Sequence, residues 1–115
     1  MDIDYIDSGV WNIAATSRSV ICPVVRSPVN TTEIDVDGCN AANTSTTCTV
    51  WVFNYNGDFQ AAQTFTESGG ASGRSWDHKV GFAQGLLTTY SYVSTLCALP
   101  ASRQGIIYGA TAIHL

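Results

Sequence analysis

Cysteine is the residue type whose chemistry is easiest to interpret in this sequence, and the chain contains Cys22, Cys39, Cys48 and Cys97. None of them belongs to a Cys-x-x-Cys pair, the close spacing that zinc sites ordinarily show. An even number of cysteines in a chain rich in Thr, Ser and Asn favours disulfides, so we expect an oxidising compartment, extracellular or periplasmic. The alternative is free, buried cysteines in a cytosolic protein.

Four cysteines allow three pairings. We expect one disulfide between Cys39 and Cys48, which would close a short loop at the base of a hairpin. The second, between Cys22 and Cys97, would join an early strand to a late one and contribute more stability, because it closes the longer loop.

An acidic stretch supplies candidate ligands for a hard cation. Asp35, Asp37 and Asn40 offer the oxygen atoms that calcium prefers, and a glycine between them indicates a turn. The spacing is not that of an EF-hand, because the glycine comes too early and no glutamate closes the loop. The alternative interpretation is the solvated face of a strand. We expect the protein to fold without a metal or another cofactor.

Histidines and carboxylates provide little for catalysis. His78 and His114 could hold copper only if neighbouring strands bring them together, because no His-x-His pair occurs. Asp77 and His78 are adjacent in a strand, so their side chains point to opposite faces and cannot form a catalytic triad. Glu33 and Glu67 are the only glutamates, and nothing marks them as a desolvated pair. The sequence therefore favours a protein that is not an enzyme.

Aromatic residues suggest binding instead. Trp76 follows a glycine-rich loop and lies beside Arg74, Asp77 and His78, where it could stack on the apolar face of a sugar at the rim of a binding site. The alternative is a core position, because Trp76 shares one face of a strand with apolar residues. Trp51 is expected in the core.

Length and composition limit the alternatives. The chain has 115 residues, 45% of them hydrophobic and only 12% charged, which predicts one folded domain over residues 1–115. The net charge of −4 argues against nucleic acid as a partner, and no apolar run is long enough for membrane insertion. The opening Met-Asp-Ile-Asp is interpreted as the start of a mature chain whose signal peptide has been removed.

Short segments rich in β-branched and aromatic residues, separated by turn signals, predict an all-β protein of about eight strands. The expected strands are Val10–Ala15, Ser19–Val25, Glu33–Asp37, Thr46–Tyr55, Phe59–Thr66, Ser75–Phe82, Thr88–Leu99 and Gly105–Ile113. This spacing is typical of an antiparallel β-sandwich, immunoglobulin-like or jelly-roll, with a barrel as the alternative. The acidic segment Met1–Ser8 is expected to be an arm that pairs with an edge strand of this chain or of another copy.

Three motifs resemble those of small secreted bacterial proteins of unknown function. They are the segment Val20–Arg26 with its Cys-Pro-Val-Val-Arg sequence, the pair Cys48-Thr49, and the segment Cys97–Pro100. The resemblance covers roughly residues 9–115, and Cys39 departs from the pattern. It implies the secreted compartment and the sandwich, and it implies no activity.

Two hypotheses about function follow. The first is an extracellular module that binds carbohydrate or another surface polymer. The second is a structural subunit of an extracellular filament or surface assembly, in which Met1–Ser8 adds a strand to a neighbouring copy. A metal-dependent secreted protein, with copper or calcium, is a further alternative.

Overall fold

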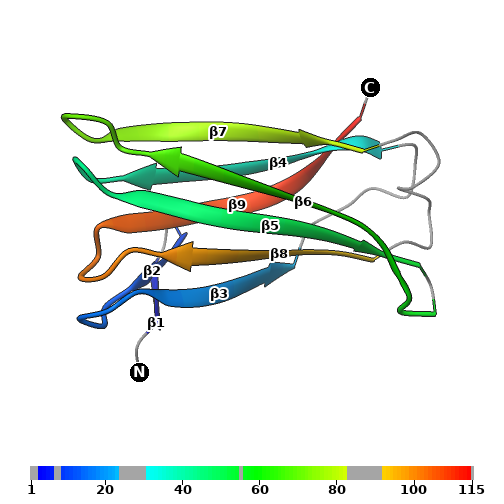
Figure 1. The fold of residues 1–115 in the computed structure, drawn as a ribbon, viewed down its shortest axis with the longest axis horizontal. Coiled ribbons are helices and arrows are strands. Elements are labelled where there is room, and N and C mark those ends of the chain that lie inside the picture. The colour runs from blue at the N-terminus through cyan, green and yellow to red at the C-terminus, as the bar shows by residue number, and fades with distance from the viewer. Residues whose placement is uncertain (1–2, 7–8, 24–30, 55, 83–91, 115) are drawn as a thin grey trace.

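The computed structural model describes residues 3–6, 9–23, 31–54, 56–82 and 92–114. These residues form nine strands, all antiparallel to their neighbours, in two sheets (Figure 1). The five-stranded sheet has the order β1-β2-β9-β4-β7, with strands Ile3–Ile6, Gly9–Asn12, Gly105–His114, Thr31–Asn40 and Arg74–Gly81. The four-stranded sheet has the order β3-β8-β5-β6, with strands Arg18–Pro23, Tyr92–Leu99, Ser45–Phe53 and Phe59–Ser68.

Alternating side chains place one face of each sheet in the core between them. In β4, Ile34 and Val36 are fully buried, and in β5, Val50 and Val52 are fully buried. The residues between them face outward, including Asp35 in β4 and the half-buried Trp51 in β5. Trp51 was expected in the core. Both faces of β5 carry apolar residues, so only the packing of the two sheets decides which face is inside.

Pairing is nested about one central hairpin. β5 and β6 are joined by a turn in which Asn54 Oδ1 accepts hydrogen bonds from the backbone N–H groups of Asn56 and Asp58, and Gly57 has φ of 85°. Around this hairpin β4 pairs with β7, β3 with β8 and β2 with β9. Between β2 and β9, every connection except the β5–β6 turn passes from one sheet to the other.

Each of the eight segments expected to be strands overlaps a strand of the structure. The ninth strand lies in the expected N-terminal arm: Ile3–Ile6 is β1, and it pairs with β2 of the same chain.

The disulfide pattern differs from the expected one. Cys48 and Cys97 are directly opposite on β5 and β8 and form a disulfide, with their Cα atoms 4.1 Å apart. The expected Cys22–Cys97 and Cys39–Cys48 bonds are therefore wrong. In register with β8, Cys22 lies opposite Thr95 instead of Cys97. Cys39 lies in the other sheet, where it is half-buried and unbonded. A residue's partner is set by strand register, which cysteine spacing does not reveal.

Candidate functional site

Trp76 lies in the core and not at a binding rim. Its side chain is 5% exposed and its indole Nε1–H donates a hydrogen bond of 2.9 Å to Asn40 Oδ1. The Phe65 ring packs against it in a T-shaped arrangement, with 6.0 Å between ring centroids and 77° between planes. Gly38, directly opposite on β4, leaves room for the indole, because a Cβ there would lie 2.8 Å from the ring carbon Cη2. An indole in this position cannot stack on a sugar.

His78 and Arg74 belong to an ionic cluster around Glu67. His78 Nδ1 lies 2.7 Å from Glu67 Oε1, and an Arg74 guanidinium nitrogen lies 2.5 Å from Glu67 Oε2. The His78 ring also stacks on Phe65, at 3.9 Å between centroids and 3° between planes. Glu67 comes from β6 and its two partners come from β7, the edge strands of the two sheets. The cluster therefore links the sheets along one open edge.

The pKa of Glu67 reports the strength of this link. Partial burial opposes the charged carboxylate and would raise the pKa, but hydrogen bonds from His78 and Arg74, together with their charges, outweigh it. The pKa of Glu67 is consequently lower than its ordinary value of 4.5. The carboxylate is therefore a structural partner of two basic groups, His78 and Arg74.

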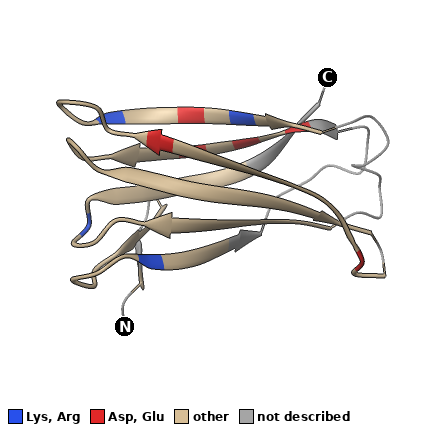
Figure 2. Cartoon of the chain, in the orientation of Figure 1, with Lys and Arg blue, Asp and Glu red and all other residues tan. Residues whose placement is uncertain are grey.

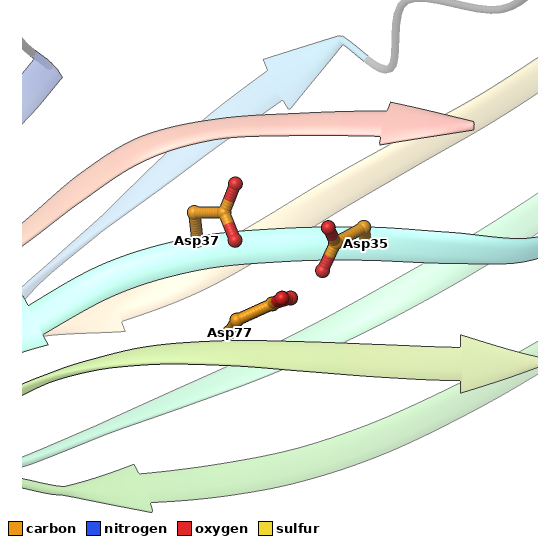
Figure 3. A group of neighbouring side chains, drawn as sticks. All are labelled: Asp35, Asp37 and Asp77. Atoms are coloured by element: carbon orange, nitrogen blue, oxygen red, sulfur yellow. The ribbon is translucent and has the colours of Figure 1, made fainter. Parts of the chain in front are cut away.

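Asp77 lies on the opposite face of β7, so the four residues expected at one ligand-binding rim do not converge. It faces outward and meets Asp35 and Asp37 of β4, all three offering carboxylate oxygens within 4.8 Å of one another (Figure 3). Lys79 Nζ lies 3.2 Å from Asp77 Oδ2, and Asp35 Oδ1 is buried without a hydrogen-bond partner. Carboxylate oxygens at this spacing are of the kind that a hard cation takes as ligands.

Asn40 was expected to complete this set with Asp35 and Asp37. It is 1% exposed and lies on the inner face of β4, where its amide oxygen accepts hydrogen bonds from Trp76 and Thr46. Asp77 takes its place because Asp37 and Asp77 are direct partners in the β4–β7 register. Asp77 is 40 positions from Asp37 in the sequence and becomes its neighbour only through the pairing of β4 with β7. The sequence pattern did not predict that pairing.

Among the described side chains, no two histidines lie together as a copper site would require. His78 is held by Glu67 and Phe65, and the side chain of His114 lies outside the described part.

The centre of the outer face of the four-stranded sheet is uncharged in the part of the chain that the structure describes. β5 and β8, its two central strands, contain no Lys, Arg, Asp or Glu (Figure 2). At one end of this face, threonines pair across β5 and β6, with hydroxyl oxygens 2.9 Å apart in both Thr47–Thr66 and Thr49–Thr64. Apolar side chains on the same face are strongly exposed, as Ile21 in β3 is at 65%.

Three aromatic rings form a row across the other end of this face. Tyr92 of β8 is directly opposite Phe53 of β5, which is opposite Phe59 of β6. Tyr92 is 62% exposed, Phe59 is 61% exposed, and Phe53 between them is half-buried. Trp51 is the next outward residue of β5. We call Tyr92, Phe53, Phe59 and Trp51 the aromatic row.

The outer face of the five-stranded sheet has a different character. A hollow of ≈ 620 Å³ opens where the β4–β5, β6–β7 and β8–β9 connections meet this face. Its lining includes Trp11, Arg74, Ser75, Arg103, Gln104 and Tyr108, together with the half-buried thiol of Cys39. No acidic residue lines it among those with described side chains. The Arg103 guanidinium carbon lies 5.5 Å from the centroid of the Trp11 ring.

Comparison of the chain with protein-family models and with curated proteins finds no match. Among the described residues there is no helix of the length and apolarity that a membrane span requires.

Proposed function

We propose that this protein is a non-catalytic extracellular module that binds polysaccharide through the aromatic row. The observation that carries the proposal is the alignment of Tyr92, Phe53 and Phe59 on three neighbouring strands, with the two outer rings more than half exposed. Large aromatic side chains ordinarily bury their area in a core or an interface. Aromatic rings that stay exposed to solvent on a regular sheet suit a ligand that has an apolar surface of its own.

A polysaccharide has that surface. The apolar face of a pyranose ring stacks on an aromatic side chain, and neighbouring strands place such rings about 4.8 Å apart. Three rings in a row therefore span roughly 10 Å, so the platform suits a polymer better than a single sugar. The absence of charge on β5 and β8 favours a neutral polymer, because no carboxylate or ammonium must be desolvated on contact.

The fold supports this proposal. Nested pairing of β4 with β7, β3 with β8 and β2 with β9 around the β5–β6 hairpin is the pattern of a jelly-roll, to which we assign the sandwich. Jelly-rolls occur in lectin domains, and the same architecture serves other functions, so the assignment rests on the site. The Cys48–Cys97 disulfide is consistent with an oxidising extracellular or periplasmic environment.

Retention on insoluble polysaccharide tests the proposal. We expect wild-type protein to be retained on microcrystalline cellulose or chitin, and the double variant Tyr92→Ala/Phe59→Ala to remain in the supernatant. Melting temperature should change little, because both side chains are more than 60% exposed. The control is Thr47→Ala/Thr66→Ala, which alters exposed residues at the other end of the same face and should be retained like wild type.

The same variants separate polysaccharide binding from assembly into a filament or surface layer, which was the second hypothesis drawn from the sequence. Sedimentation should give a monomer for wild type and for both double variants. Wild-type protein that forms oligomers, dissociates on Tyr92→Ala/Phe59→Ala and is retained on neither polysaccharide would contradict the proposal. The aromatic row would then be a contact between copies of the chain.

A further inference from the structure

We infer that the hollow on the five-stranded sheet is a second ligand site, which takes an acidic saccharide through its carboxylate. The site lies on the opposite face of the sandwich from the aromatic row and does not depend on it. Its lining includes Arg74 and Arg103, and it contains no acidic residue among those whose side chains the structure describes. Because Arg74 is paired with Glu67, the guanidinium of Arg103 supplies the positive charge of the hollow.

The backbone at Arg103 gives the first reason to look for a ligand. Ser102 and Arg103 have φ of 56° and 62°, in the left-handed region that glycine and asparagine adopt most readily. They are the central residues of a tight turn closed by a hydrogen bond from Gln104 N–H to the Ala101 carbonyl. The surroundings hold this turn, because the N–H groups of Ser102 and Arg103 donate to the carbonyls of Ala14 and Asn12. An arginine in a position that favours glycine indicates a use for its side chain.

The guanidinium of Arg103 is also held in place. It lies over the Trp11 ring at 5.5 Å, a cation–π contact that fixes its direction while its N–H groups remain donors around the rim of the plane. A planar fork of this kind matches a carboxylate, which it can bind with two parallel hydrogen bonds. Because the fork is already oriented, less conformational entropy is lost when the ligand binds.

Arg74 also lines the hollow, but its guanidinium is already paired with Glu67 through the NH2 nitrogen. Among the lining residues, Arg103 is therefore the positive group left to bind a carboxylate. Ser75 and Gln104 add polar groups to the same lining, and Tyr108 adds an aromatic ring that is 45% exposed. An oriented arginine, polar side chains and an open ring together match a uronic acid: a sugar ring with hydroxyls and one negative charge.

Calorimetric titration with trigalacturonate and with its methyl ester tests the site. The two probes share the sugar framework and differ in charge. We therefore expect wild-type protein to bind the acid, and its affinity for the ester to be lower by about thirtyfold or more. Titration is done in the Tyr92→Ala/Phe59→Ala background as well, where the affinity for the acid should be unchanged. Equal affinity for acid and ester, or equal affinity for sulfate, would overturn the assignment.

Variants at Arg103 separate a binding role from a structural one. Arg103→Gly removes the guanidinium and suits the positive φ, so affinity for trigalacturonate should fall about thirtyfold or more while the melting temperature stays within a few degrees of wild type. Arg103→Gln gives the same loss if the glycine variant folds poorly. Arg18→Gln removes one positive charge on β3, at a residue that does not line the hollow, and should keep wild-type affinity. Either Arg103 variant binding like wild type would contradict the proposal.

Discussion

At the scale of single residues, the core depends on a glycine beneath an indole. A Cβ at Gly38 would lie 2.8 Å from the Ile106 carbonyl oxygen and 2.8 Å from the Cη2 atom of Trp76, and both distances are shorter than real Cβ contacts allow. We expect Gly38→Ala to lower the free energy of unfolding by about 1–3 kcal/mol, measured by urea denaturation. Gly109→Ala is the matched control. That glycine also lies in a strand, nothing lies within 4 Å of its added Cβ, and stability should not fall.

Trp76→Ala extends the same test. Removing a buried indole should cost about 3–5 kcal/mol through lost burial and the cavity that remains. It also leaves Asn40 Oδ1 with one hydrogen-bond donor fewer. A variant as stable as wild type would contradict the core position of this side chain.

Glu67 makes the stability of the protein depend on pH. Its pKa is lower in the folded state than the ordinary value of 4.5, so between these two values the unfolded chain binds more protons. The stabilisation is therefore present above pH 4.5 and is lost as the pH falls through the folded pKa. We expect the stability difference between wild type and Glu67→Gln to be largest at neutral pH and to shrink on acidification, as measured by urea denaturation across that range. A constant difference would show that His78 and Arg74 do not stabilise the charged carboxylate.

At the scale of elements, the disulfide joins two central strands that are already neighbours. Cys48 and Cys97 are 49 residues apart, and in the loop-entropy model such a bond stabilises by about 4 kcal/mol. We expect Cys48→Ala/Cys97→Ala to lose roughly that amount, while Cys39→Ser, at an unbonded and half-buried thiol, changes stability by about 0.5 kcal/mol or less. Non-reducing peptide mapping should recover Cys48 and Cys97 together. A peptide joining Cys22 to Cys97 would contradict this pairing.

Strands β4 and β7 carry the acidic cluster, and its charges repel. Asp35, Asp37 and Asp77 offer oxygens within 4.8 Å of one another, whereas one ammonium group, on Lys79, lies beside them at 3.2 Å from Asp77. We expect Asp37→Asn to raise the melting temperature in buffer that contains a chelator, because it removes like-charge repulsion. Lower stability of Asp37→Asn under these conditions would mean that the carboxylate has a stabilising partner. Repeating the scan with calcium chloride reports whether a cation offsets the repulsion in wild type.

At the scale of the whole molecule, the two outer faces should respond differently to salt. Charge screening shortens from about 8 Å at physiological ionic strength to about 3 Å at 1 M, and it weakens ion pairs while leaving apolar stacking intact. Raising sodium chloride should therefore weaken trigalacturonate binding at the hollow and leave retention on neutral polysaccharide unchanged. If salt weakens both trigalacturonate binding and retention on neutral polysaccharide, the two ligands share one electrostatic site, and the two faces are not chemically distinct sites.

The sequence by itself determined the fold class and the approximate position of most strands. Alternating apolar residues in segments such as Glu33–Asp37, together with turn signals such as Asn56-Gly57, are local properties, and strand formation depends on them. The sequence also placed Trp76 on one face of a strand with apolar residues, and in the structure it is buried on the same face as Val80.

Only the tertiary structure decided which residues meet across strands. The Cys48–Cys97 bond, the approach of Asp77 to Asp37 and the row of Tyr92, Phe53 and Phe59 all follow from strand register. Register is set by how two sheets bury their apolar faces against each other, and a shift of one residue reverses the face on which every side chain of a strand lies. For that reason Trp51 could be recognised as a strand residue from the sequence, whereas its outward position could not.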